Sequence, residues 1–162
     1  MTRHFLLLLA LCLAVLAGCS EGRPGDVRTV LPINAIAYND SVLPVHESGQ
    51  AHLVDGTHSI DESLLIEPAP GHTPGHILLK VLGERGGVFC GDVIHHPLQI
   101  YAPHWNTQFC RDPEQARATR RGVLQYCADS GSLLFPTHFG RPHVASVSER
   151  GGQFSAGFVQ PR

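Results

Sequence analysis

After about residue 50, the chain consists of short apolar runs separated by turn residues, a pattern that predicts β-strands. The expected strands cover residues 51–54, 63–67, 77–82, 88–90 and 132–135. Asp55-Gly56 is a strong turn pair after the first of them, and Pro136 stops the last. Residues 143–147 and 153–159 predict a hairpin around residues 149–152.

One segment, residues 113–128, has the pattern of an amphipathic helix. Asp112 suits the N-cap, and Pro113 suits the first helical position, where a missing N–H costs nothing. A mostly apolar face of this helix would contain Ala116, Arg120, Val123, Leu124 and Cys127. A shorter helix, interrupted by Pro44, is expected within residues 39–48. Strands mixed with helices predict the α/β (α+β) class, a sheet with helices packed on it.

The N-terminus predicts an export signal. Residues 5–17 form an apolar run behind Arg3 that is too short for the roughly 20 residues of a membrane helix. The run ends in Leu16-Ala17-Gly18-Cys19, which resembles the lipobox of bacterial lipoproteins. We therefore expect a signal peptide at 1–18, lipidation at Cys19, a linker at 19–38 and a domain at 39–162, exported and anchored to the membrane. An ordinary signal peptide, or a displaced start codon before a cytoplasmic protein, is the alternative.

Composition narrows the class of protein. Hydrophobic residues make up 43% and charged residues 16%, a balance that suits a globular core. The net charge of −2 offers no basic surface, so we expect no nucleic-acid partner. No Cys-x-x-Cys pair occurs, which disfavours a zinc-finger site. Cys90 is expected in the core, and a Cys110–Cys127 disulfide would suit an oxidising compartment.

Three predicted strands run into loops that carry candidate metal ligands. Residues 63–67 lead to His72 and His76, residues 88–90 lead to Asp92, and residues 132–135 lead to His138. Loops at strand ends are where α/β sheets place their sites. Imidazole and carboxylate ligands suit zinc, and also manganese or non-haem iron. The pattern therefore predicts a metal site built from the three loops.

The order and spacing of these motifs resemble the metallo-β-lactamase superfamily. The resemblance rests on Gly71-His72-Thr73-Pro74-Gly75-His76, then Gly91-Asp92, then Thr137-His138-Phe139, and covers about residues 39–159. Residues 95–99, His-His-Pro-Leu-Gln, and residues 112–121 are closest to its lactonase-like branch. The resemblance implies an αββα sandwich made from two similar halves, of which this chain holds the C-terminal half.

The resemblance also implies roles for the candidate residues. His72 would bind one zinc ion, His138 the other, and Asp92 would bridge them as the catalytic carboxylate. Hydroxide held by one or two ions would attack the ester, lactone or related carbonyl of a small-molecule substrate. His76 would support the ligands from behind. His95 and His96 would either face the cleft or pack against or cap a turn. Trp105 would lie in the core or at the rim.

One signature of the family is missing from the chain. The superfamily carries a His-x-His-x-Asp-His run in its first half, and no such run occurs here. Catalytic zinc usually has three protein ligands, so each ion would hold fewer than usual. The alternatives to a working hydrolase are therefore a truncated, non-catalytic fragment and a half that needs a complementing chain. A single sheet would also expose an apolar face that favours self-association.

Overall fold

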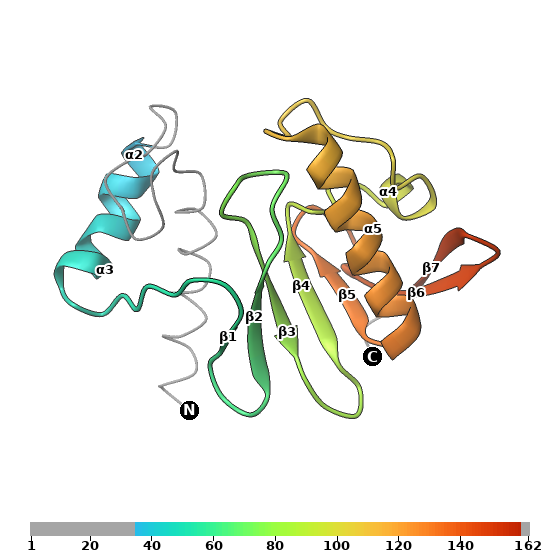
Figure 1. The fold of residues 1–162 in the computed structure, drawn as a ribbon, viewed down its shortest axis with the longest axis horizontal. Helices are drawn as coiled ribbons and strands as arrows, with labels where there is room; N and C mark the ends of the chain where they lie inside the picture. The colour runs from blue at the N-terminus through green and yellow to red at the C-terminus, as the bar shows by residue number, and fades with distance from the viewer. Residues whose placement is uncertain (1–34, 160–162) are drawn as a thin grey trace.

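The computed structural model describes residues 35–159 (Figure 1). The predicted signal peptide and Cys19 lie outside these residues. The described part begins with a helical stretch formed by α2 (Ala35–Ala37), the π-helical η2 (Tyr38–Val42) and α3 (Leu43–Glu47). Pro44 does not interrupt it as predicted, because this residue falls in the first turn of α3, where a missing N–H is tolerated. Between residues 35 and 159, no helix is long and apolar enough to cross a membrane.

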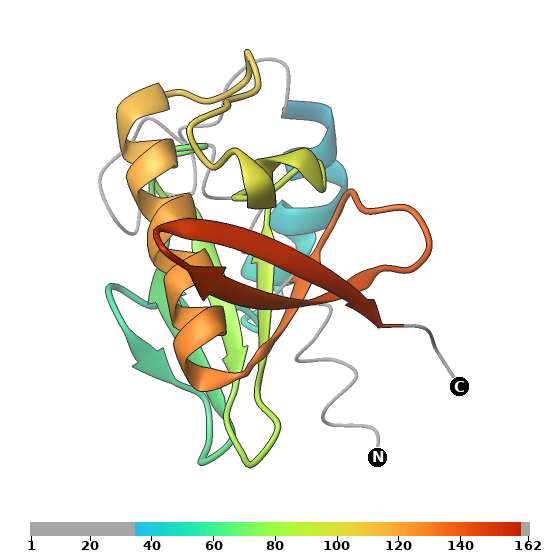
Figure 2. The ribbon, with the colours of Figure 1, turned by 90° about the vertical axis from the view of Figure 1, so that its right-hand side faces the viewer.

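Within the described residues, seven strands form one sheet in sequence order, which confirms the predicted α/β class. They are β1 (His58–Ser59), β2 (Leu64–Pro68), β3 (Ile77–Val81), β4 (Gly87–Gly91), β5 (Leu133–Pro136), β6 (Val144–Arg150) and β7 (Gln153–Val159). Only β4 and β5 pair in parallel, because α5 (Pro113–Ser130) carries the chain between them. The β6–β7 hairpin runs at a steep angle to β2–β4 (Figure 2).

The strand expected at residues 51–54 is absent, and this prediction is wrong. Leu53 and Val54 are 51% and 38% exposed, and the chain reaches the sheet only at β1, after the turn that contains Gly56. An apolar run without a neighbouring strand to pair with does not form a ladder. A short helix, α4 (Leu98–Tyr101), was not anticipated.

Helix α5 follows the prediction closely. The Asp112 carboxylate accepts hydrogen bonds from the backbone N–H groups of Glu114 (3.1 Å) and Gln115 (2.9 Å), as an N-cap should. Gly131, at φ 70°, ends the helix in the left-handed conformation. The face predicted from the sequence is buried: Ala116, Arg120, Val123, Leu124 and Cys127.

The core lies between α5 and one face of the sheet, and includes Val88, Cys90, Leu134 and Ala145, all fully buried. The Cys110–Cys127 disulfide, which the sequence left open, is not formed, since both thiols are free. Cys127 packs in this core, where burial raises its pKa to about 12.

The other sheet face carries a second set of apolar side chains. Side chains alternate along a strand, so Phe89 points away from the core that holds Val88 and Cys90. Its ring stacks on Phe135 of β5, with centroids 4.6 Å apart, and Phe89 remains 42% exposed. A single sheet with an exposed apolar face is the architecture expected of half a sandwich.

Candidate metal centre

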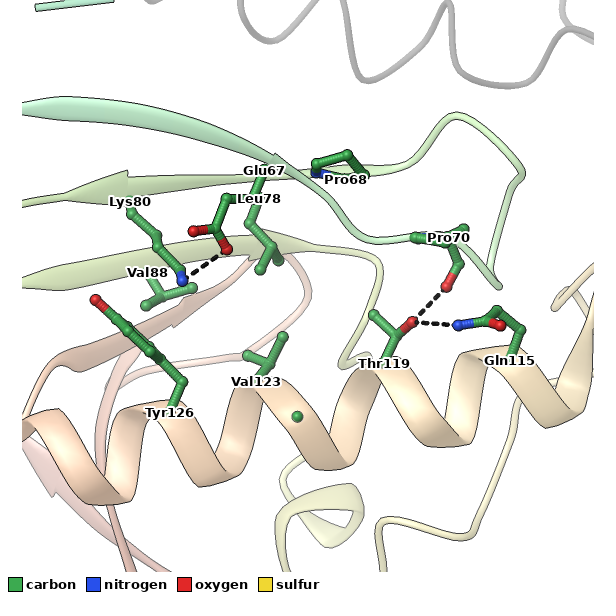
Figure 3. Close-up of a pocket in the computed structure, with 11 residues that line it drawn as sticks. Glu67, Pro68, Pro70, Leu78, Lys80, Val88, Gln115, Thr119, Val123 and Tyr126 are labelled. Carbon is green, nitrogen blue, oxygen red and sulfur yellow. Dashed lines mark hydrogen bonds and ion pairs between the residues drawn. The ribbon is translucent and has the colours of Figure 1, made fainter. Parts of the chain in front are cut away.

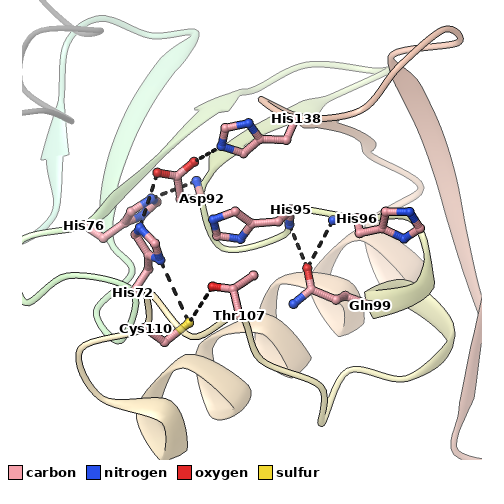
Figure 4. Close-up of polar contacts among 9 residues, drawn as sticks. All are labelled: His72, His76, Asp92, His95, His96, Gln99, Thr107, Cys110 and His138. Carbon is pink, nitrogen blue, oxygen red and sulfur yellow. Dashed lines mark hydrogen bonds and ion pairs between the residues drawn. The ribbon is translucent and has the colours of Figure 1, made fainter.

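The candidate ligands meet because three strands point the same way. Strand β2 is antiparallel to β3, which is antiparallel to β4, and β4 is parallel to β5. The carboxyl ends of β2, β4 and β5 therefore share one edge of the sheet. The loops that leave this edge carry His72 and His76, then Asp92 and His95, and finally His138 (Figure 4).

Asp92 is the centre of the cluster. Its Oδ1 lies 2.8 Å from Nε2 of His138, and its Oδ2 lies 3.4 Å from Nε2 of His72. The two imidazoles thus approach different oxygens of one carboxylate. The Asp92 side chain is 31% exposed and that of His138 is 50% exposed, so the cluster is open to solvent on the His138 side.

His95 joins the same cluster. Its ring stacks parallel to that of His138, with centroids 5.0 Å apart, and lies 4.9 Å from the ring of His72. One potential ligand atom from each of His72, Asp92 and His95 lies within 4.8 Å of the other two. The sequence left open whether His95 faces the cleft or packs against a turn, and the structure places its ring beside those of His72 and His138.

His96 follows the other alternative that the sequence left open, in which the residue caps a turn. Its Nδ1 accepts a hydrogen bond from the backbone N–H of Leu98 at 3.2 Å, in the first turn of α4. Its ring points away from the cluster (Figure 4). His96 therefore caps a turn.

His76 lies behind Asp92. Its Nε2 accepts a hydrogen bond from the backbone N–H of Asp92 at 3.0 Å, so the ring supports the main chain that presents the carboxylate. The side chain is buried, and desolvation lowers its pKa to about 4. Asp92 opposes this shift, while His72 and His95 add to it.

Burial disfavours the protonated form of two imidazoles of the cluster, those of His72 and His95. Burial is the largest cause of a lowered pKa at both His72 and His95, and the neighbouring histidines and Arg120 lower it further against the opposing charge of Asp92. A metal ion binds the neutral imidazole, so this environment suits metal binding. The donor set of imidazole nitrogens and carboxylate oxygens fits zinc. Among the residues that the structure describes, the buried Nδ1 of His95 has no hydrogen-bond partner, which further suits a site that receives a ligand.

Comparison with known proteins supports the fold. No protein-family model matches the chain, and no curated protein matches it. Among solved structures, the hydrolase AbOPH of the β-lactamase superfamily aligns with a TM-score of 0.67 and 18% identity over 86% of this chain and 51% of its own. The chain has a metallo-β-lactamase-like fold.

Two further structures share this metallo-β-lactamase-like fold. The dizinc quorum-quenching lactonase AidC has a TM-score of 0.61 at 20% identity, covering 78% of this chain and 45% of its own. A probable metal-dependent hydrolase from Staphylococcus aureus has a TM-score of 0.60 at 15% identity, covering 71% and 42%. The chain thus spans about half the length of the proteins it resembles.

A buried arginine, whose role the sequence did not reveal, holds the loops of this metallo-β-lactamase-like half together. Arg120 of α5 is fully buried and donates to the carbonyls of Val93 (2.8 Å), Pro103 (2.8 Å) and Trp105 (2.7 Å). It also donates to Oδ1 of Asn106 at 3.1 and 3.2 Å. One guanidinium therefore fixes both the segment after Asp92 and the segment that leads to α5. The signal in the sequence that points to this role is a charged residue on the otherwise apolar face of the helix.

Gln99 completes this support from the start of α4. Its Oε1 accepts from the backbone N–H groups of His95 (2.7 Å) and His96 (3.2 Å). Its Nε2 donates to the Trp105 carbonyl at 2.9 Å. Trp105 is 53% exposed, which favours the rim over the core, and it contributes its backbone to this network. The buried side chain of Gln99 therefore fixes the backbone at His95.

The structure also has a groove between α5 and strands β2–β4, which reaches Pro70 in the loop that carries His72 (Figure 3). Its charged groups are already paired. The Nζ atom of Lys80 lies 2.7 Å from Oε2 of Glu67 and 3.6 Å from the centre of the Tyr126 ring. Thr119 Oγ1 donates to the Pro70 carbonyl at 2.6 Å.

Proposed function

We propose that the chain carries the metal site of a zinc-dependent hydrolase acting on an ester, lactone or related carbonyl. The observation that carries this proposal is the arrangement of His72 and His138 on opposite oxygens of Asp92, at the shared edge of three strands. The likeness to a dizinc lactonase and to two hydrolases supports it. Manganese or iron would fit the same ligands.

In this proposal, His72, Asp92 and His138 hold one or two ions. A bound zinc ion lowers the pKa of water toward ~7 and polarises a carbonyl. The residues of the chain fix the geometry: His76 holds the backbone of Asp92, and Arg120 and Gln99 hold the segment that follows. The exposed edge of His138 leaves the site open to a small-molecule substrate.

The direct test is hydrolysis of lactones and esters by the purified chain. We expect turnover with zinc that exceeds free zinc in the same buffer and that is lost after chelation. Asp92→Asn should abolish the zinc-dependent rate, because the amide is neutral and is a much weaker metal ligand. His96→Asn is the matched control, since His96 caps a turn outside the cluster. A rate that survives Asp92→Asn would contradict the proposed site.

A second candidate function is that of a half that needs a complementing chain. The aligned structures are about twice as long as the matched region, the His-x-His-x-Asp-His run is absent, and Phe89 is exposed on the second sheet face. Co-expression with a chain that carries the missing run distinguishes the candidates. Zinc-dependent turnover only in the mixture would favour the complementing half. Zinc binding without turnover under either condition would favour a non-catalytic fragment.

A further inference from the structure

We infer that Cys110 is a positioning residue for the metal ligand His72: its sulfur accepts the Nδ1–H of the imidazole and so keeps Nε2 free to bind the ion. This inference rests on the proposed metal site and adds the residue that orients one of its ligands. Sγ of Cys110 lies 3.9 Å from Nδ1 of His72, on the side of the ring opposite Asp92 (Figure 4). Histidines that bind a metal almost always donate their second ring nitrogen to a partner, which fixes the tautomer and the orientation of the ring.

The surroundings of Cys110 determine where the thiol proton lies. The amide of Asn106 is oriented by two neighbours: its Oδ1 accepts from Arg120 at 3.1 and 3.2 Å, and its Nδ2 donates to the Pro113 carbonyl at 2.7 Å. The atom of this amide that faces Sγ, at 4.0 Å, is therefore the oxygen, which can only accept. Cys110 donates its S–H toward Asn106, which leaves the sulfur lone pairs to accept from His72.

With the proton on Nδ1, Nε2 of His72 presents a lone pair to Asp92. This nitrogen lies 3.4 Å from Oδ2 of the carboxylate, which is also an acceptor. Two unprotonated acceptors that face each other need a cation between them. Atoms bound to one tetrahedral zinc ion at ~2.1 Å lie ~3.4 Å apart, so the gap has the width of a pair of ligands on one ion. The tautomer that Cys110 selects is thus the one that metal binding requires.

The backbone around Cys110 holds the sulfur in place. Cys110 is buried, and its backbone N–H donates to the Thr107 carbonyl at 3.4 Å. The N–H of the next residue, Arg111, donates to the His72 carbonyl at 3.0 Å. The segment that carries the thiol therefore contacts both the main chain and the ring of His72, so the two side chains keep a fixed relation.

Chelator competition with zinc on the full chain tests whether Cys110 supports this ligand. Cys110→Ala removes the acceptor, and we expect it to weaken zinc binding about 10-fold, at the low end of the effect of losing a ligand's supporting partner. Cys110→Ser keeps an acceptor on a shorter bond and should recover part of the loss. Cys127→Ala is the matched control, because it removes a buried thiol from the core and should leave the zinc affinity unchanged. Thermal unfolding of each metal-free variant checks that the fold is kept.

Nitrogen-15 NMR of the metal-free chain, at a pH where the ring is neutral, reads the tautomer itself. His72→Gln assigns the signals of this ring. The wild type and Cys127→Ala should carry the proton on Nδ1. Cys110→Ala should shift it toward Nε2, which can then donate to Asp92. A merely structural role of the thiol would not move this signal.

Three results would decide against the inference or its basis. If Cys110→Ala changes neither the zinc affinity nor the tautomer, or if Cys127→Ala costs as much affinity, the inference is wrong while the metal site stands. With cobalt(II) in place of zinc, a sulfur-to-metal charge-transfer band that Cys110→Ala removes would show that Cys110 is itself a ligand and would also overturn it. If the wild type binds no zinc, the proposed function fails, and the tautomer of the metal-free chain still decides whether Cys110 orients His72.

Discussion

At the residue scale, His76 shows how burial adapts one side chain to a supporting role. The ring is 2% exposed, and its Nε2 accepts the N–H of Asp92. Only an unprotonated nitrogen can accept this bond, so the contact requires the neutral imidazole that the lowered pKa of about 4 provides. Protonating His76 would break the bond and place a charge beside His72 and His95.

This pKa makes the stability of the metal-free protein depend on pH. As the pH falls from about 6.5 to about 4, the unfolded chain takes up a proton at His76 that the folded chain does not. The free energy of unfolding should therefore fall across this window, by up to about 3 kcal/mol from His76, and level off below it. Urea unfolding with chelator present measures the slope. His76→Gln should flatten it in part, and an unchanged slope would contradict this assignment.

How far the sequence predicts the site depends on the range of the interactions. His72, Asp92 and His138 could be predicted because each follows a strand in a local motif. His95 and His96 could not be told apart, since adjacent residues differ only in which way the folded loop turns them. The network of Arg120 joins α5 to backbone carbonyls 15 to 27 positions away in the sequence, and backbone acceptors leave no trace in residue type.

At the element scale, the close approach of the β2–β3 loop to α5 sets the position of His72. The backbone N–H of Asp112 donates to the Gly71 carbonyl at 2.9 Å, and that of Arg111 donates to the His72 carbonyl at 3.0 Å. Gly71 has φ +131°, and a Cβ there would lie 2.3 Å from the backbone nitrogen of Ala116. Only glycine lets the loop rest against the first turn of the helix.

Gly71→Ala should therefore destabilise the protein strongly. Helix backbone cannot yield easily, so we expect a loss of about 2–4 kcal/mol in the free energy of unfolding and weaker zinc binding as His72 shifts. Gly122→Ala is the control, because that helical glycine has open space around it and alanine should add up to about 1 kcal/mol. Chemical denaturation measures both. Equal effects of the two substitutions would contradict the close contact.

Helices and strands could be predicted where residues at their ends mark the start or the stop. Asp112 and Pro113 mark the start of α5, and Pro136 marks the end of β5. The prediction of a strand at residues 51–54 failed because an apolar run becomes a strand only if it pairs with a neighbouring strand. No local sequence pattern encodes that pairing. Helix α4 was missed because a single turn is too short to show periodicity.

At the scale of the whole molecule, the sheet has two apolar faces and α5 covers one. The Phe89–Phe135 stack lies on the other, and Phe89 is 42% exposed. The aligned structures extend over about twice the matched length. We therefore expect this face to associate with a second copy or with a complementing chain.

Phe89→Glu should weaken this association, because a carboxylate on the face would have to be desolvated. Analytical ultracentrifugation of the wild type should show dimers or larger species, and the variant should shift toward the monomer. Phe109→Glu is the control, since Phe109 is 69% exposed on a loop outside the sheet. A wild type that stays monomeric at high concentration would contradict the expectation.

Export and anchoring are predictions from the sequence alone, because Cys19 lies outside the described residues. Several acyl chains anchor a protein firmly, whereas one binds only marginally. Cys19→Ala should leave the protein unprocessed or release it from the membrane fraction of a bacterial host. Cys90→Ala is the control, since that thiol is buried in the core. A wild-type protein that is cytoplasmic and keeps its N-terminal Met would rule out the anchor.

X-ray absorption at the zinc edge of the loaded, purified chain tests the central claim most directly, because it reports the atoms around the ion. The account predicts nitrogen and oxygen neighbours at ~2.0–2.2 Å with the outer scattering of two imidazoles. Asp92→Asn should reduce this signal, since the ion would be bound more weakly. A shell with sulfur at ~2.3 Å, which Cys110 beside His72 could supply, or a shell without imidazole scattering would contradict it.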